Sequence, residues 1–215
     1  MFVGHYASAL AARAIEPRAP LWTYVLACQA LDVVWGSLVL AGVEKVAVDH
    51  DLPGNTLVLS HMPYTHGLPA AVFWSVVFGA GLMLWLKLPR RVGVVLGLTV
   101  FSHWLLDFLV HRPDLPLLWD EPKVGLGLWN YPVPEQALEM GLLAMAAAAW
   151  GWRRGVEGRS WKAAPLFLGF LLFLQVVPLV SPVSEAGLGV GGSALAAYMV
   201  TCVFAWMTEP RVVRS

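Results

Sequence analysis

Charged residues are scarce in this sequence. Only 13% of its 215 residues are Asp, Glu, Lys or Arg, and 14 acidic residues balance 14 basic ones. A chain without net charge creates no overall field that attracts nucleic acid, so we expect no nucleic-acid partner. Hydrophobic residues make up 58% of the chain and the mean hydropathy is +0.66, which is too apolar for a soluble domain of this size. We therefore expect the chain to be embedded in lipid.

Cysteine is also rare, with two residues in the whole chain. Cys28 and Cys202 lie in separate apolar runs, a distribution that argues against a disulfide framework. We expect both side chains to be packing residues.

Long apolar runs, in contrast, are abundant. A bilayer core of about 30 Å needs roughly 20 apolar residues per helix, and prolines or glycines separate runs of this length. The candidate spans are residues 20–43, 67–88, 92–111, 132–152, 163–181 and 189–207. The fold class that we expect is all-α: a polytopic membrane helical bundle of about six transmembrane helices plus a short N-terminal helix.

We expect a single membrane domain over residues 1–215. Residues 1–150 contain the polar side chains at membrane depth, whereas residues 163–209 add two apolar helices without a motif of their own. The apolar stretch 2–15 is too short to span a bilayer and lacks the features of a signal peptide, so we expect it to remain in the mature protein.

The basic residues predict the orientation of the bundle, because cytoplasmic loops are enriched in Lys and Arg. The loops 44–66 and 112–131 hold only Lys45, Arg112 and Lys123. The other basic residues fall at the chain ends or in the alternate loops: Arg13, Arg18, Lys87, Arg90, Arg91, Arg153, Arg154, Arg159, Lys162, Arg211 and Arg214. We therefore expect both termini in the cytoplasm and the two long loops outside.

Four polar side chains fall at a similar depth in the expected helices. At about 1.5 Å per residue, Asp32 and His103 lie roughly 18 Å above the inner face. Asp107 lies one turn higher, and Glu139 of the next helix falls near the same level. A carboxylate at the centre of a span costs about 2.5–3.5 kcal/mol on insertion scales, so we expect these groups to face one another.

The types and spacing of these residues predict a metal site. His103 and Asp107 are four residues apart, on one face of a helix, and imidazole beside carboxylate suits a divalent transition metal, most readily zinc. The segment LSHMPYTHGL (59–68) adds two histidines before an apolar helix, and the N-terminal half-helix adds another. We expect the metal ligands among His5, Asp32, His61, His66, His103, Asp107 and His111.

Each candidate also has a structural interpretation. Asp32 and Glu139 could bond to Ser or Trp side chains of neighbouring helices, and His61 could be a solvated loop residue. Interfacial anchoring is an equal alternative for His111, Arg112 and Asp114. Solvated loop charges are expected at Glu44, Asp49, Asp51, Asp120 and Glu121.

Several segments, in this order, resemble a known family. The order runs through His5, Asp32, MPYTHGL (62–68), SHWLLDFLVHRPDLPL (102–117), GLGLWN (125–130) and a helix bearing Glu139. Over roughly residues 1–150 it resembles the predicted membrane-bound metal-dependent hydrolases, a group of bacterial inner-membrane proteins. Its His-to-Asp pattern is also distantly similar to that of zinc-dependent phospholipases C and related single-strand nucleases, which are all-helical enzymes.

The resemblance implies a bacterial inner-membrane location. The metal ligands that it implies are Asp32, His66, His103 and Asp107, with His66 preferred to His61 as the histidine from the loop. The resemblance also implies that Asp107 bridges to a second ion that His5 helps to hold. The soluble enzymes carry a further histidine and a His-to-Glu pair, where this chain has Glu135 and Glu139. With His111 supplying the missing nitrogen, we expect one or two zinc ions.

A hydrolytic site of this kind has a defined chemistry. The metal lowers the pKa of bound water from about 15.7 toward about 7 and polarises a phosphoryl oxygen, while Asp107 or Glu139 accepts the proton. Arg112 at the outer mouth would hold a phosphate. We expect a phosphodiester or a lipid-linked substrate that enters from the outer leaflet or from the extracytoplasmic space. Membrane lipids are the other expected partners.

Two other classes of function fit the same residues. Intramembrane Asp, Glu and His side chains also form proton or ion relays, so a small permease is the main alternative. Its hallmark would be two structural repeats, and the likeness between residues 57–68 and 98–109 is too weak to support a duplication. A structural membrane protein with a vestigial site is the third class.

Overall fold

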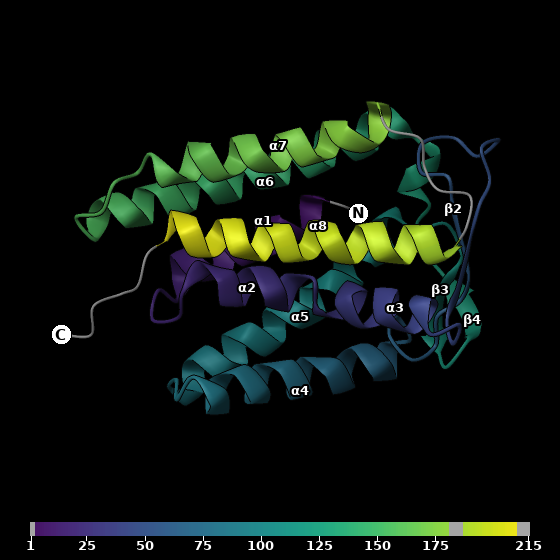
Figure 1. The fold of residues 1–215 in the computed structure, drawn as a ribbon, viewed down its shortest axis with the longest axis horizontal. Helices are drawn as coiled ribbons and strands as arrows, with labels where there is room; N and C mark the ends of the chain where they lie inside the picture. The colour runs from purple at the N-terminus through teal and green to yellow at the C-terminus, as the bar shows by residue number, and fades with distance from the viewer. Residues whose placement is uncertain (1–2, 181–186, 210–215) are drawn as a thin grey trace.

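The computed structural model describes residues 3–180 and 187–209. Its long helices lie side by side and its strands gather at one end of the bundle (Figure 1). The described helices are η1 (Val3–His5), α1 (Tyr6–Ile15), α2 (Leu21–Cys28), α3 (Ala30–Leu40), α4 (Leu68–Trp85), α5 (Arg90–Val110), η2 (Leu128–Asn130), α6 (Pro132–Val156), α7 (Ala163–Val180) and α8 (Gly187–Thr208). The strands are β1 (Lys45–Val48), β2 (Leu57–His61), β3 (Leu115–Leu118) and β4 (Glu121–Val124).

The first expected span is broken into two helices. α2 ends at Cys28, α3 begins at Ala30, and the pair is bent by 54°. Gln29 between them has φ −107° and ψ 9°, which interrupts the regular ladder of backbone hydrogen bonds. The break leaves carbonyl groups at the end of α2 to accept other donors, and it places Asp32 in the first turn of α3.

Two small antiparallel hairpins occupy the two long loops that the sequence predicts. β1 pairs with β2, and β3 pairs with β4. The fold is therefore mostly helical rather than all-α. The sequence does not predict these strands, because each has only four or five residues and only β1 alternates exposed with half-buried side chains.

Three helices of the described chain are long and apolar enough to cross a membrane: α4, α5 and α8. The bent pair α2 and α3 raises the number to four if it is counted as one span. The apolar stretch of α7 is shorter, at Ala163–Val177, and α6 includes Glu135, Glu139, Arg153 and Arg154. These helices indicate a membrane protein, but they do not establish six spans.

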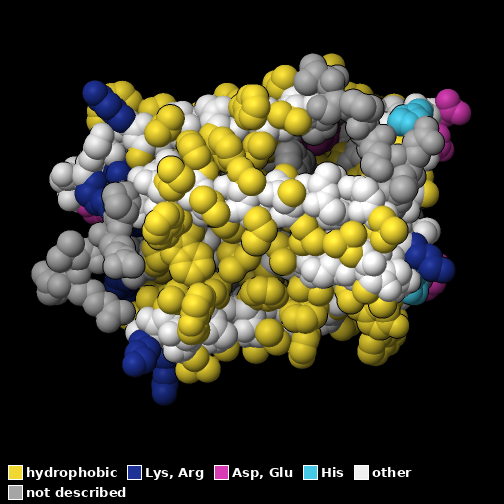
Figure 2. Space-filling model, viewed as in Figure 1, with side chains coloured by type: hydrophobic (Ala, Val, Ile, Leu, Met, Phe, Trp, Pro, Cys, Tyr) yellow, Lys and Arg dark blue, Asp and Glu magenta, His cyan; other side chains and the backbone are white. Residues whose placement is uncertain are grey.

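The face of the bundle in Figure 2 is largely apolar between two ends where charged side chains gather. Large side chains that are more than half exposed occur on all five long helices, for example Val76 of α4, Leu98 of α5, Met145 of α6, Phe173 of α7 and Val203 of α8. On the face shown, Lys and Arg gather mainly at the end away from the hairpins, whereas Asp, Glu and His appear mainly at the hairpin end. Such a surface suits a bilayer.

The short helix α1 lies inside the bundle. Tyr6, Ala9 and Leu10 are fully buried, and α1 packs against α2, α5 and α6. Its small side chains, in the sequence YASALAARAI, allow these neighbours to approach closely. α8 packs on α2 and α3, so the C-terminal part of the chain belongs to the same bundle as the polar residues.

Candidate metal centre

Four histidines and two aspartates from separate elements meet inside the bundle. They are His5 at the end of η1, Asp32 in α3, His66 before α4, His103 and Asp107 in α5, and His111 after α5. The four histidines and Asp107 are each at most 3% exposed, whereas the side chain of Asp32 is 16% exposed. The polar cluster is thus almost closed, with Asp32 at its more open edge.

The carboxylate of Asp107 lies at the centre of this cluster. Its Oδ1 is 3.1 Å from His5 Nε2 and 3.4 Å from His111 Nε2. Its Oδ2 is 3.1 Å from His103 Nε2 and 3.6 Å from His66 Nε2. Each oxygen therefore faces two imidazole nitrogens, as expected of a carboxylate that bridges two cations.

Asp32 brings a second carboxylate to the cluster. Its Oδ1 lies 3.4 Å from His66 Nε2 and 3.5 Å from His103 Nε2. Its Oδ2 accepts a hydrogen bond of 2.8 Å from the hydroxyl group of Tyr198 in α8. One oxygen therefore faces the imidazoles while the phenol holds the other in place.

The orientation of two histidines is fixed by their Nδ1 atoms. His103 Nδ1 lies 2.7 Å from the backbone carbonyl oxygen of Cys28, which is free because the helix breaks there. His111 Nδ1 lies 2.9 Å from Asp114 Oδ1. Since both partners are acceptors, each Nδ1 donates a proton, and each Nε2 keeps a lone pair for a cation.

His66 is oriented in the same way through a hydroxyl group. Its Nδ1 lies 2.8 Å from Thr65 Oγ1, and this hydroxyl donates its own proton to Glu44 Oε2 at 2.7 Å. The Thr65 oxygen is therefore left to accept from the His66 Nδ1–H group. His66 Nε2 then also keeps a lone pair directed at the carboxylates.

Buried nitrogens of the cluster fit a metal better than a network of hydrogen bonds. His5 Nδ1, His5 Nε2 and His103 Nε2 make no regular hydrogen bond in the described part of the chain. An unsatisfied buried polar atom costs about 1–3 kcal/mol. The rings of His5 and His103 also stack with centroids 3.7 Å apart, where two protonated imidazoles would repel each other. A cation bound at the two Nε2 atoms would satisfy them without adding protons.

Two overlapping groups of side chains have the geometry to hold an ion. His5, His103 and Asp107 form one group, and Asp32, His66 and His103 form the other. Within each group the candidate ligand atoms lie within 4.8 Å of one another. Nitrogen and oxygen donors of this kind suit zinc and other divalent transition metals. These buried side chains can therefore hold a metal ion.

The structure places His61 outside these groups. It belongs to β2, and its Nδ1 lies 2.7 Å from Asp120 Oδ2. Asp120 also accepts a hydrogen bond from Lys123. Partial burial acts to raise the pKa of the Asp120 carboxyl, but Lys123 and His61 outweigh this effect and lower it from 3.8. His61 therefore connects the two hairpins.

Arg112 and Glu139 also have partners outside the two ligand groups. Arg112 donates hydrogen bonds to Asn130 Oδ1 and to the backbone carbonyl of Pro53, at 2.8 and 2.7 Å. The guanidinium thus ties the first hairpin loop to η2. Glu139 is fully buried on α6 and accepts a hydrogen bond of 3.0 Å from Gln175 of α7. Neither residue is in a ligand group found among the described residues.

Three residues that support the cluster are not expected from the sequence: Glu44, Thr65 and Tyr198. The expectation that Glu44 is solvated is wrong, since this residue is 1% exposed and bonded to the turn before His66. Tyr198 lies in a helix whose sequence suggests no site, and nothing local identifies it. Only Thr65 has a local signal, a hydroxyl directly beside a candidate ligand in MPYTHGL.

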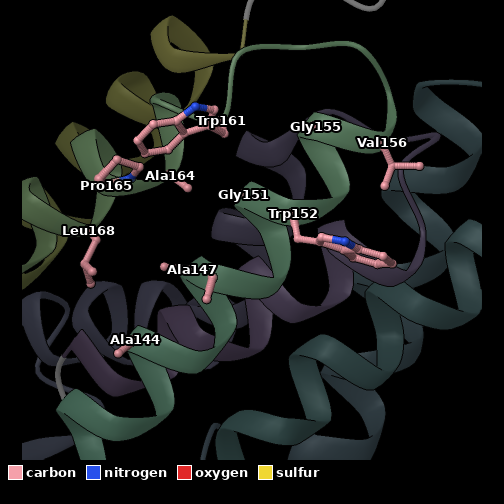
Figure 3. Close-up of a pocket in the computed structure, with 11 residues that line it drawn as sticks. Ala144, Ala147, Gly151, Trp152, Gly155, Val156, Trp161, Ala164, Pro165 and Leu168 are labelled. Carbon is pink, nitrogen blue, oxygen red and sulfur yellow. The ribbon is translucent and has the colours of Figure 1, made fainter.

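One hollow on the surface, lined by none of the residues of the cluster, lies away from it. It is a groove of about 700 Å³ between α6 and α7 (Figure 3). Ala147 and Gly151 line it from α6, and Ala164 and Leu168 line it from α7, with Trp161 at one end. Since aliphatic and aromatic side chains line this groove, it offers no chemistry comparable to that of the polar cluster.

Comparison of the chain with models of known protein families, with curated proteins and with solved structures gives no match. The functional argument therefore rests on the geometry of the cluster.

Proposed function

We propose that this chain is a membrane-embedded metal-dependent hydrolase that uses the Asp107 cluster. The observation that supports the proposal is the position of the Asp107 carboxylate, whose two oxygens each face two imidazole Nε2 atoms at 3.1–3.6 Å. Three of these imidazoles donate through Nδ1 to other partners, so their Nε2 atoms are prepared for a cation.

In this proposal His5, Asp32, His66, His103, Asp107 and His111 hold one or two divalent ions, with zinc as the first choice. When bound, such an ion supplies a more acidic water and polarises a substrate oxygen. Asp107 lies between the two halves of the cluster. Asp32 has the more exposed side chain of the two aspartates, so it lies on the side that a substrate reaches, held by Tyr198.

Arg112 has a structural role in addition to the one expected from the sequence. Its guanidinium already donates to Asn130 and to backbone carbonyls of the first hairpin loop. We therefore assign to Nε and Nη2 of Arg112 the task of holding the outer loops together, whereas its Nη1 atom, which has no hydrogen-bond partner among the described residues, stays the candidate for binding a phosphate. Glu139 remains the second candidate, beside Asp107, for accepting a proton.

The proposed substrate is a phosphodiester or a lipid-linked compound reached from the outer side of a bacterial inner membrane. The orientation is supported by the concentration of Lys and Arg at the end opposite the hairpins (Figure 2). The apolar faces of the helices support a lipid surround. A buried site between such helices is reached most readily by a substrate that itself resides in lipid.

Elemental analysis of the detergent-purified protein tests the proposal most directly. Wild type should contain about one or two zinc ions per chain, and His103→Ala and Asp107→Asn should lose both the metal and phosphodiesterase activity on phospholipids. The exposed outer-loop residues His50 and Asp51 provide matched controls as His50→Ala and Asp51→Asn. Wild-type protein without a transition metal would refute the proposal.

A small ion-coupled permease remains the second candidate because of the break between α2 and α3. Helices interrupted at an ion site are common in secondary transporters, and here the bend of 54° lies next to Asp32. Proteoliposomes separate the two candidates. Solute or ion uptake that Asp32→Asn abolishes, without any product of hydrolysis, would favour the permease.

A further inference from the structure

Glu44 is a buried carboxylate with no partner of opposite charge among its described hydrogen bonds. It follows α3, precedes β1, and is 1% exposed. A buried carboxylate needs several hydrogen-bond donors to be tolerated. The donors to Glu44 all come from the turn just before α4, about twenty residues further along the chain.

Three hydrogen bonds connect Glu44 to this turn. Oε1 accepts from the backbone N–H of Tyr64 at 2.9 Å and from that of Thr65 at 3.1 Å. Oε2 accepts from the Thr65 hydroxyl at 2.7 Å. The carboxylate thus fixes both the backbone of the turn and the direction in which the Thr65 hydroxyl points.

The direction of that hydroxyl determines the tautomer of His66. Because the Thr65 proton is donated to Glu44, the Thr65 oxygen can only accept from His66 Nδ1, which lies 2.8 Å away. His66 must then carry its proton on Nδ1. Its Nε2 is left with a lone pair, 3.4 Å from Asp32 Oδ1 and 3.6 Å from Asp107 Oδ2.

We propose that Glu44 is a positioning residue that acts through Thr65 to hold His66 in the Nδ1–H tautomer, with Nε2 directed into the cluster. The proposal deepens the proposed function, because it specifies how one ligand is prepared for a divalent cation. Its structural part, the chain Glu44–Thr65–His66, does not depend on which metal binds or which bond is cleaved.

Three substitutions test the chain of hydrogen bonds from Glu44 through Thr65 to His66, which we call the relay. Glu44→Gln replaces one carboxylate oxygen by an amide that donates, so the Thr65 hydroxyl is released to donate toward His66 and the Nε2–H tautomer gains population. Thr65→Val removes the hydroxyl at almost constant volume. Thr65→Ser keeps the hydroxyl and should therefore retain the wild-type zinc affinity and His66 tautomer. Glu121→Gln, at an exposed position in β4, is the matched control for the charge change.

Two measurements on the full-length protein in detergent report the outcome. The zinc affinity, measured by competition with a chromophoric chelator, should fall by about 10–100-fold in Glu44→Gln and Thr65→Val, as for other residues that orient a ligand. It should stay at the wild-type value in Thr65→Ser and Glu121→Gln. Nitrogen-15 NMR of labelled histidines should show the Nδ1–H form of His66 in wild type and a shift toward Nε2–H in the first two variants.

The two readouts separate the relay from the proposed function. If wild type binds no zinc but His66 changes tautomer in Thr65→Val, the proposed hydrolase fails and the relay stands. If wild type binds zinc while Thr65→Val and Glu44→Gln keep both the affinity and the tautomer, the relay is wrong and the hydrolase stands. A lower melting temperature with unchanged affinity and tautomer would assign Glu44 a purely structural role and would also overturn the relay.

Discussion

The imidazole rings of His5 and His103 stack in parallel, with centroids 3.7 Å apart and planes inclined by 2°. His5 closes the short helix η1 at the start of the chain, whereas His103 lies in the middle of α5. The Nε2 atom of each ring lies 3.1 Å from a different oxygen of Asp107. The N-terminal helix thus completes one half of the polar cluster around Asp107.

Substitution of His5 should remove one half of this cluster and spare the other. His5→Phe keeps a stacked ring on His103 but supplies no nitrogen, and the second group of Asp32, His66 and His103 stays intact. If wild type binds two ions, the zinc content should fall to about half. Mass spectrometry of the purified protein measures it, with His50→Phe as the exposed control. An unchanged zinc content in His5→Phe would show that His5 is not a ligand.

Glu209 should stabilise the folded state at the end of the bundle away from the hairpins. Glu209 follows α8, is 2% exposed, and accepts hydrogen bonds from the buried Arg13 at 2.6 and 2.9 Å and from the backbone N–H of Leu21 at 2.8 Å. Glu209→Gln leaves the Arg13 charge poorly compensated, so we expect a loss of about 3–5 kcal/mol in the free energy of unfolding.

Denaturant unfolding in detergent measures that loss. Glu157 offers the matched control, because it lies 3.6 Å from the same Arg13 but its side chain is 20% exposed. Glu157→Gln should cost less than about 1 kcal/mol. Equal losses in the two variants would contradict the role that we assign to the buried carboxylate.

Glu16 should make the stability depend on pH. Hydrogen bonds from Arg18 hold the pKa of the Glu16 carboxyl below its ordinary value of 4.5. Because folding lowers the pKa of this carboxyl, its ionised form stabilises the folded state at pH values above the unfolded pKa of 4.5. This contribution is lost as the pH falls below 4.5 and through the lower pKa of the folded state. The melting temperature of Glu16→Gln should therefore lie below that of wild type near pH 7, and the difference between the two should shrink as the pH falls.

Thermal unfolding of wild type and Glu16→Gln over a range of pH gives the measurement. Arg18→Gln should reproduce the effect in part, because it removes the donor that is responsible for most of the shift. A difference between wild type and Glu16→Gln that stays constant or grows toward acid pH would show that the ionised carboxylate is not the stabilising species.

The contact between α4 and α5 should tolerate no side chain at Gly79. A Cβ atom there would lie 2.8 Å from the carbonyl oxygen of Gly93 and 2.9 Å from the backbone nitrogen of Gly97. Gly79→Ala must push the two helices apart, at a cost of about 1–3 kcal/mol. Gly81 lies in the same helix with open space around its Cβ position, so Gly81→Ala should not destabilise the protein. Similar melting temperatures for the two variants would contradict this packing.

The sequence by itself predicts an all-α membrane bundle, and the structure bears out its mostly helical character, because runs of about 20 apolar residues and the scarcity of charge are properties of composition. It also places His103 and Asp107 together, since a helix repeats every 3.6 residues and brings positions four apart onto one face. Asp32 at a similar depth follows from counting residues. These inferences need only the local geometry of a helix.

The rest of the candidate site is decided by tertiary structure. The sequence does not reveal whether His61 or His66 faces Asp107, because that depends on the conformation of a turn and the pairing of two hairpins. Nor does it reveal that Glu44 is buried against Thr65, or that Tyr198 from α8 reaches Asp32. These contacts join residues that are 21 and 166 positions apart. Such contacts form only when separate helices and turns pack together, and no local periodicity encodes that packing.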